Sequence, residues 1–244
     1  MPTTNRPEHV ASAVSDPKLV GERRARILDV AVKLFSEEGY YVTTVQQIAR
    51  ASGVSIGLIY QYFGDKDDIL FLSLKLVLDR YETEIPARLE GLVHPVDRLC
   101  TAIWAYCSIV DELRHAAVLT YRSTKSLRAD RRTLIQDAEK RTNQLLERCV
   151  RECVDGGYMR AVDEFLFAYQ IVMFCHAWAL KNWALRDRYN LGEYVSRGIG
   201  LVVEPFLTAK GRTALVALRR HSDDFHRVPG ARRSRARAAR TVAG

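Results

Sequence analysis

Apolar residues recur at helical spacing along most of the chain. Over residues 19–221 they return every three or four positions, and alternating runs bounded by tight-turn dipeptides are nearly absent. In the first predicted helix, over about 19–38, Ile27, Ala31 and Phe35 fall on one face. The pattern therefore predicts an all-α protein whose core forms by helix packing.

Two short helices joined by a tight turn follow the first helix. Thr44 precedes Gln47 at the spacing of a capping box, which predicts the start of a helix. A glycine-containing turn at residues 52–54 leads into a third helix, for which Ser55 is the expected N-cap. Helix, short turn and helix form the pattern of a helix-turn-helix, here over residues 44–63.

Polar side chains without charge lie on the outward face of the third helix. The amide of Gln61 can pair with adenine in the major groove, and the hydroxyl of Tyr60 suits a phosphate. Gly57 lets another surface approach the backbone closely. Lys66 begins the fourth helix, where a cation opposes the helix dipole, so we expect it to bind an external anion. The pattern favours DNA binding over a small helical hairpin with a solvated polar face.

The residues from Arg23 to Leu70 carry a set of short motifs at fixed spacings. These are Ile27-Leu28, Ala31, Leu34-Phe35, Gly39, Thr44-Val45, Ile48-Ala49, Gly53-Val54-Ser55, Gly57, Ile59-Tyr60, Tyr62-Phe63 and Lys66. This stretch resembles the DNA-binding domain of the TetR family of bacterial transcriptional regulators. The resemblance implies an N-terminal three-helix DNA-binding domain over residues 21–81. It also implies a homodimer whose third helices enter successive major grooves of a palindromic operator in double-stranded DNA.

The resemblance also implies which residues contact DNA. The set is Thr44, Gln46, Ser55, Ile56, Gly57, Tyr60, Gln61, Tyr62 and Lys66. Within it, the hydroxyls of Thr44, Tyr60 and Tyr62 would touch phosphates, as would the ammonium of Lys66, and the two glutamines would face base edges. Ile56 departs from many members of the family, which carry a polar or basic residue there; its methyl groups could contact a thymine methyl. Packing roles for the tyrosines and simple solvation of the glutamines remain alternatives.

Residues 82–221 are expected to form a helical ligand-binding and dimerisation domain. The predicted helices cover about 95–112, 113–126, 128–155, 163–186 and 190–209. The resemblance extends here only as an architecture, with a ligand cavity within the first three helices and a homodimer interface from 163–186 and 190–209. The segment 163–186 is apolar nearly all round, which fits a helix buried on two sides. We interpret its His176 as a hydrogen-bonded interface residue rather than a ligand-binding one.

A small-molecule effector is expected in this second domain. Aromatic and cationic side chains indicate a cavity with an apolar interior and a positively charged mouth. The candidate residues for the interior are Trp104, Tyr106, Cys107 and Tyr121, and those for the mouth are Arg122, Lys125, Arg128, Arg131 and Arg132. Such a cavity fits an amphipathic anion, for example an acyl-CoA thioester, with its phosphates at the cations. A hydrophobic drug-like or steroid-like effector is the main alternative, and aromatic residues at this spacing also fit an ordinary core.

Charge is distributed unevenly along the 244 residues. The net charge of +8 comes from residues 210–244, which hold ten Lys and Arg against two Asp, while residues 1–209 are neutral overall. A basic tail attracts any polyanion without specifying one, so the DNA-binding prediction depends on the helix-turn-helix. We expect residues 1–20 to form a flexible arm and residues 222–244 a disordered tail.

Several classes of protein are excluded or disfavoured by the sequence. It has no nucleophile elbow, phosphate loop or metal motif, so an enzyme is not expected, nor a cofactor or metal. Cys149 and Cys153 share a helix face, but two ligands do not make a metal site. The longest nearly apolar run, residues 165–180, is shorter than the ~20 residues of a membrane span, and no secretory signal precedes it, so we expect a cytoplasmic protein. A ligand-independent or activating DNA-binding regulator is the alternative function.

Overall fold

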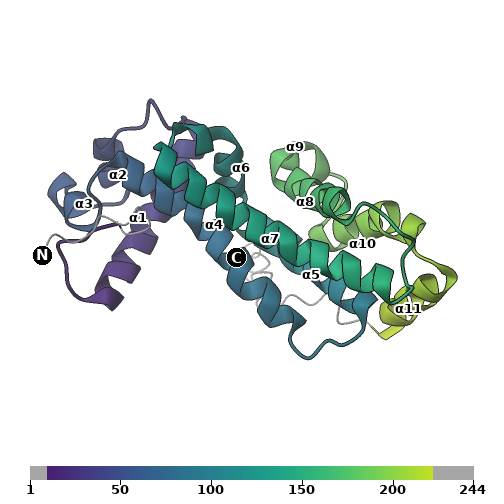
Figure 1. Ribbon diagram of the computed structural model, residues 1–244. Helices are drawn as coiled ribbons and strands as arrows, with labels where there is room; N and C mark the ends of the chain where they lie inside the picture. Colours follow the sequence, from purple (N-terminus) through teal and green to yellow (C-terminus); the bar gives the residue numbers. More distant parts are fainter. Residues whose placement is uncertain (1–9, 222–244) are drawn as a thin grey trace, which may run out of the picture.

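The computed structural model describes residues 10–221, which form an elongated arrangement of helices (Figure 1). The helices are α1 (Pro17–Glu37), α2 (Val45–Ala51), α3 (Ile56–Tyr62), α4 (Lys66–Leu89), α5 (Pro95–Glu112), α6 (Arg114–Ser123), α7 (Ala129–Asp155), α8 (Glu164–Leu180), α9 (Asn182–Leu185), α10 (Leu191–Val202) and α11 (Ala209–His221), with 3-10 turns η1 (Thr124–Ser126) and η2 (Glu204–Phe206). Within the described range, extended pairing is limited to one isolated bridge between Met159 and Leu207. The prediction of an all-α fold is confirmed.

The first three helices pack together at one end of the molecule (Figure 1). Thr44 caps α2 in the predicted box, because its hydroxyl accepts the Gln47 N–H while the Gln47 side chain accepts the Thr44 N–H. The Ser55 hydroxyl accepts the Leu58 N–H at 3.1 Å and so caps α3. Gly53, with a φ of +68°, makes the turn between them in a conformation that favours glycine. Both predicted caps are confirmed.

The segment before α1 differs from the flexible arm expected over residues 1–20. Helix α1 begins at Pro17, because the Asp16 carboxylate caps it and proline is well suited to a first helical turn. Residues 10–16, which we call the N-terminal strap, pack against α3, and Val10 is only 5% exposed. An isolated apolar residue such as Val10 creates no periodic pattern, so this packing could not be predicted from the sequence. Residues 1–9 and the basic tail, 222–244, lie outside the described residues.

Helix α4 joins the N-terminal unit, which we define as α1 to α3 with the first turn of α4, to the rest of the chain. It packs on α1 and α6 and, farther along, on α5 and α7, so that α4 and α7 cross the molecule together (Figure 1). Its capping residue is Asp65, whose carboxylate accepts the Asp68 N–H at 2.8 Å. Because α4 contacts both α1 and the larger bundle, it is one element through which the two parts can influence each other.

The C-terminal helices are shorter than predicted. The segment predicted as one helix over 163–186 is divided at Lys181, where the backbone leaves the helical region between α8 and α9. The helix predicted over 190–209 ends at Val202, and Pro205 lies in the 3-10 turn that follows, since proline lacks the N–H that a longer helix would need. Helix α11 then follows, an element that the pattern does not predict separately. No helix in residues 10–221 is both long and apolar enough to cross a membrane.

Candidate DNA-binding surface and effector cavity

The helix-turn-helix presents one polar surface to solvent. Ile48, Ala49 and Ile59 point into the core, which turns the opposite sides of α2 and α3 outward. Seven of the predicted DNA contacts are exposed there: Thr44, Gln46, Ser55, Ile56, Gly57, Tyr60 and Gln61. A methyl group built at Gly57 would meet nothing closer than the Ser55 hydroxyl, at 3.9 Å, so the start of α3 is open to close approach. The sequence-based expectation therefore agrees with the observed exposure of these side chains.

Tyr62 does not join this surface. It is 3% exposed and belongs to the hydrophobic core. The backbone carbonyl of Tyr62 accepts two hydrogen bonds from Arg24, at 3.0 and 2.7 Å. In this structure Tyr62 therefore acts as a packing residue, which is the alternative that the sequence left open.

Lys66 also has partners that the sequence did not indicate. Its ammonium donates to the carbonyl oxygens of Tyr40 at 2.9 Å, Tyr41 at 3.4 Å and Thr43 at 3.0 Å. It also lies 4.4 Å from the centre of the Tyr40 ring. An ammonium has three hydrogens to donate, and these three carbonyls match them. Lys66 thus fixes the α1–α2 loop to the start of α4, in place of the external anion expected from the sequence.

Arg24 is a residue that the sequence analysis missed. Besides the Tyr62 carbonyl, its guanidinium donates to the carbonyls of Val10 at 2.7 Å and Ala11 at 3.0 Å. It lies 5.6 Å from the centre of the Phe63 ring, and burial lowers the pKa of Arg24. One arginine of α1 therefore joins the end of α3 to the N-terminal strap. In the sequence, only the position of Arg24 beside the apolar face of α1 could have indicated this role.

An ion-pair cluster connects α7 directly to the start of α4. Arg131, 3% exposed, donates to Asp67 at 2.9 Å and also pairs with Asp68. Asp68 accepts the Gly64 N–H at 2.6 Å, which continues the cluster to the turn between α3 and α4. Arg122, predicted to bind the effector, instead donates to the Ser36 carbonyl of α1 at 2.9 Å. Both α6 and α7 are thus hydrogen-bonded to the N-terminal unit.

Helices α4 to α8 line a partly open cavity of about 250 Å³. Its lining is Val77, Leu78, Tyr81, Tyr106, Ala117, Thr120, Tyr121, Thr124, Lys125, Arg132, Gln136, Glu139, Asn143, Val172 and His176. Tyr106, Tyr121, Lys125 and Arg132 were predicted and line it. Trp104, Cys107 and Arg122 are outside this lining. Cys107 is fully buried on α5, because the face of α5 that meets the cavity carries Tyr106 instead.

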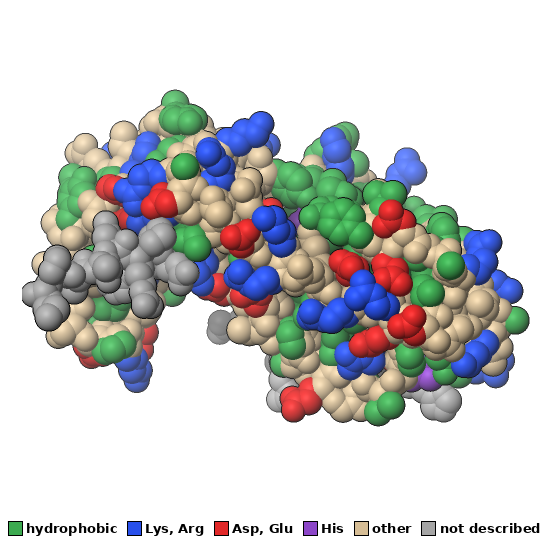
Figure 2. All heavy atoms as spheres, in the orientation of Figure 1, with side chains coloured by type: hydrophobic (Ala, Val, Ile, Leu, Met, Phe, Trp, Pro, Cys, Tyr) green, Lys and Arg blue, Asp and Glu red, His purple; other side chains and the backbone are tan. Residues whose placement is uncertain are grey.

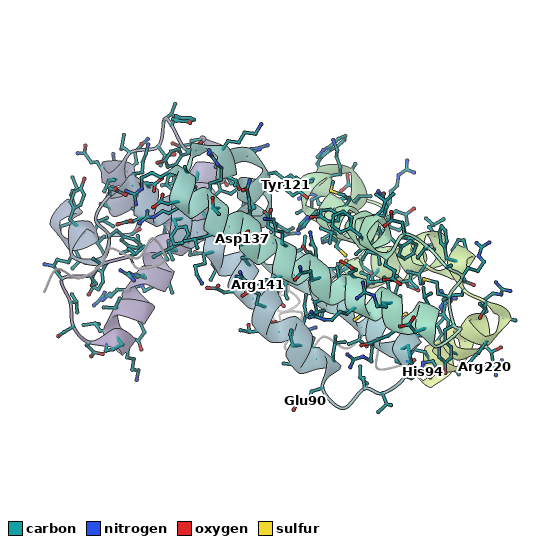
Figure 3. All side chains as sticks on the ribbon, in the orientation of Figure 1. Glu90, His94, Tyr121, Asp137, Arg141 and Arg220 are labelled. Carbon is teal, nitrogen blue, oxygen red and sulfur yellow. The ribbon has the colours of Figure 1, made fainter. Side chains whose placement is uncertain are left out.

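Three tyrosine hydroxyls surround one imidazole in this cavity. The Nε2 of His176 lies 3.3 Å from the Tyr81 hydroxyl and 3.1 Å from that of Tyr106, and its Nδ1 lies 2.7 Å from the Tyr121 hydroxyl. Figure 3 shows Tyr121 reaching from α6 toward α8. Burial lowers the pKa of His176 to about 4 and raises that of Tyr121 to about 12. The cluster is therefore uncharged near neutral pH, with one ring nitrogen donating and the other accepting.

His176 is hydrogen-bonded, as expected, but it lines the cavity. The rest of the lining combines both signs of charge, since Lys125 and Arg132 face it together with Glu139. Burial raises the pKa of the Glu139 carboxyl. A cavity of this size is slightly smaller than the ~300–1,000 Å³ of typical drug-sized sites. It can therefore take a compact group that forms hydrogen bonds, with a larger anionic part held outside.

No metal centre is formed by the described residues. Among residues 10–221, no three His, Cys, Asp or Glu side chains gather as they would around an ion. Cys149 and Cys153 are buried thiols, and burial raises their pKa values to about 11 and about 12. Such thiols are inert, since the reactive and metal-binding form is the thiolate.

A hydrophobic surface extends over α8, α9 and α10. Figure 2 shows hydrophobic side chains gathered where α8 and α9 lie. The exposed apolar residues are Phe165, Leu166, Met173, Trp183 and Leu201, with Trp183 at 72% and Leu201 at 79%. Large exposed apolar areas are characteristic of protein–protein contacts. They lie on the helices predicted to form the dimer.

Comparison with known proteins yields matches to both parts of the chain. Residues 27–72 match the family model "Bacterial regulatory proteins, tetR family", and residues 93–183 match "Tetracyclin repressor-like, C-terminal domain". The HTH-type transcriptional regulator HbdR of Aromatoleum sp. (strain CIB) is 63% identical over 222 residues, which cover 91% of this chain and 97% of that protein.

Solved structures give the same arrangement of helices. The TetR family regulator PfmR from Thermus thermophilus has 27% identity and a TM-score of 0.67, covering 73% of this chain and 97% of that one. AibR, in complex with isovaleryl coenzyme A and operator DNA, has 21% identity and a TM-score of 0.66, covering 74% of this chain and 97% of that one. At that identity, the similarity to AibR indicates a shared fold alone.

Proposed function

Because the chain belongs to the TetR family of bacterial transcriptional regulators, we propose that it is a homodimeric repressor that a small-molecule effector releases from a palindromic operator. It regulates transcription through DNA binding and is not an enzyme. In this proposal residues 21–81 read the operator, and residues 82–221 form the dimer and, together with Val77, Leu78 and Tyr81 of α4, bind the effector.

The observation that carries the proposal is the connection between the cavity helices and the helix-turn-helix. The cavity is lined from α6 by Tyr121 and from α7 by Arg132. Each of these residues is adjacent in sequence to an arginine bound to the N-terminal unit, namely Arg122 on Ser36 and Arg131 on the first turn of α4. A ligand that moves α6 or α7 therefore acts directly on the unit that carries α3.

The proposed dimer places two copies of α3 on one face of DNA. The apolar surface of α8, α9 and α10 supports an isologous contact, in which the same patch of each protomer meets its copy. Two-fold symmetry then requires a palindromic operator with half-sites separated by about 34–36 Å or a multiple. On each half-site Gln46, Ile56, Gly57 and Gln61 would face base edges, and Thr44, Ser55 and Tyr60 would lie near the phosphate backbone.

A compact acyl-CoA thioester is the effector class that the cavity supports best. The volume of about 250 Å³ suits a short or cyclic acyl group rather than a long chain. The uncharged Tyr–His cluster can hydrogen-bond the thioester carbonyl, while Lys125 and Arg132 provide positive charge for phosphates. AibR, which has the same fold, is described with isovaleryl coenzyme A. An uncharged hydrophobic effector remains the alternative.

Release requires that the effector bind one conformation more tightly than the other. An effector that lowers operator affinity a hundredfold must supply a coupling free energy of about 2.7 kcal/mol. By linkage, the operator must weaken effector binding by the same factor. An effector at its own site lowers operator affinity only to a limit set by this coupling free energy, whereas a molecule that competes with DNA for positive charge lowers it further with every increase in concentration. A plateau in the titration therefore identifies a true effector.

The test is fluorescence anisotropy of the purified protein on DNA from upstream of its own gene. Salt is fixed at ~0.15 M with non-specific competitor, because electrostatic binding to DNA depends steeply on salt. Short-chain and aromatic acyl-CoA thioesters are added, with long-chain thioesters and free coenzyme A as controls. Specific binding released by a compact thioester alone supports the proposal. Specific binding unchanged by every thioester refutes this effector class, and binding without sequence preference refutes the repressor.

A further inference from the structure

The N-terminal strap, residues 10–16, is hydrogen-bonded to the end of α3, the proposed recognition helix. The Ala13 N–H and the Ser12 hydroxyl both donate to the Gln61 carbonyl, at 2.8 and 3.0 Å. Arg24 then joins the strap to the next carbonyl of α3, that of Tyr62. The strap therefore moves with α3 and occupies a fixed place beside it.

The length of α3 brings this attachment point close to any DNA that α3 contacts. Helix α3 has seven residues, so at 1.5 Å per residue it is only ~10 Å long. Gln61, in its last turn, is both a proposed base contact and the residue that holds the strap. A major groove is ~12 Å wide and a helix with its side chains fills it. Because Gln61 is proposed to reach a base edge, a segment bonded to the Gln61 carbonyl would lie at the rim of the groove, near the phosphates.

The chemistry of the strap suits a position against phosphates. Its exposed side chains are small, at Ala11, Ala13 and Ser15, so the backbone can approach another surface closely. Its single carboxylate, Asp16, already accepts the Lys18 and Leu19 N–H groups at the start of α1. The guanidinium of Arg24 lies under the strap and adds positive charge. No other charged residue interrupts residues 10–16.

We propose that residues 10–16 form a second DNA-contacting element, which lies against the phosphates beside the recognition helix. The inference rests on the proposed operator binding and adds a contact outside the helix-turn-helix. The strap thereby extends the protein's footprint beyond the bases that α3 reads. Its contacts go to the phosphate backbone, so they raise affinity for every sequence alike.

The first test reverses the sign of a charge at one exposed position. Ala13→Lys and Ala13→Glu are compared with the same two substitutions at Ala161, an exposed alanine in the loop between α7 and α8. Ala13→Lys should tighten operator binding and steepen the plot of log affinity against log salt by about 0.9 per protomer. Ala13→Glu should weaken binding roughly fivefold at low salt. The two Ala161 variants should bind as the unmodified protein does.

A DNA contact predicts opposite effects of Ala13→Lys and Ala13→Glu on operator affinity, which a purely structural role of the strap does not. If both Ala13 variants weaken binding together and both lower the melting temperature, the strap only supports α3 and the proposal is overturned. If neither variant differs from the unmodified protein, the strap faces solvent and the proposal is equally overturned. These results leave operator binding by the unmodified protein intact. Failure of that protein to bind any specific DNA would instead refute the proposed function itself.

A second measurement locates the strap without depending on affinity. All five native cysteines are buried, so a cysteine introduced by Ala13→Cys can be labelled selectively with an iron chelate that cleaves nearby DNA. Cleavage should occur in the backbone at the outer or inner edge of each half-site, within reach of α3. The Ala161→Cys protein carries the same label and should give no cleavage. Absence of cleavage from position 13, while the labelled protein still binds the operator, would contradict the inference.

Discussion

Replacing Arg131 by methionine removes the cation that joins α7 to the start of α4. Arg131 is 3% exposed and its partner Asp68 is 7% exposed. Removing one member of a buried ion pair costs about 3–5 kcal/mol, since the other charge stays buried without compensation. Asp68 keeps the Gly64 N–H and lies in the first turn of α4, where the helix dipole stabilises an anion. We therefore expect the lower end of that range, about 3 kcal/mol.

Thermal unfolding followed by circular dichroism measures this loss. For a chain of this size, about 3 kcal/mol corresponds to a melting temperature lower by roughly 6–12 °C. Arg141→Met is the matched control, because Arg141 lies on the same helix and pairs with Glu82 at 2.8 Å at an exposed position (Figure 3). Such a surface pair contributes about 1 kcal/mol or less. The two substitutions thus differ in burial and not in the residue type removed.

A double-mutant cycle with Asp68→Asn tests whether the cost belongs to the pair. The combined variant Arg131→Met, Asp68→Asn should lose at least about 1 kcal/mol less than the two single losses added together. Additive losses would mean that Arg131 stabilises through another contact, such as that of its guanidinium with the Phe71 ring, whose centre lies 5.0 Å away. A loss from Arg131→Met no larger than that from Arg141→Met would refute the reasoning altogether.

Three further predictions concern the cavity and the DNA-binding unit. Burial lowers the pKa of His176 to about 4 from an ordinary 6.5, so between these values the unfolded chain binds a proton that the folded chain does not. The free energy of unfolding should therefore fall as pH drops through this window, by at most ~3 kcal/mol. Urea unfolding at several pH values measures this loss. If the His176→Phe protein showed the same loss, His176 would not be the group responsible. Lys66→Met should lower the free energy of unfolding by about 1–2 kcal/mol without changing the salt dependence of operator binding. If the slope of log affinity against log salt fell by about 0.9 per protomer, Lys66 would contact a phosphate instead. Gln61→Ala should weaken operator binding by about 1–3 kcal/mol and leave affinity for unrelated DNA unchanged in anisotropy titrations, whereas equal losses on both DNAs would contradict a base contact.

Local interactions were the part of this structure that the sequence could predict. Each cap depends on atoms three residues apart, so Thr44 with Gln47, and Ser55 before α3, were visible in the sequence. The same holds for the outward face of α3, since burial of Ile59 determines which side chains remain outside. The helix-turn-helix is therefore predictable, because the interactions that define it join residues close together in the sequence.

Long-range polar contacts were not predictable in this way. The acceptors of Lys66 lie 23–26 residues earlier, and the carboxylates that bind Arg131 lie 63 and 64 residues earlier. The sequence around a charged helical residue does not show whether its partner is water, DNA or another helix. The cavity shows a related limit on α5, where periodicity identifies a buried residue but cannot distinguish the core from a cavity. Tyr106 and Cys107 were therefore both expected to line the site, and only Tyr106 does.

The position of Trp183 has a consequence for spectroscopy. Trp178 is buried and donates its indole N–H to Asp111 at 2.8 Å, whereas Trp183, on α9, is 72% exposed within the apolar surface. Indole emission shifts to shorter wavelength when the ring leaves water. Pairing of two protomers through this surface would transfer Trp183 from water into an interface, while Trp178 would keep its surroundings. The emission wavelength of Trp183 can therefore report subunit association without an added label or DNA.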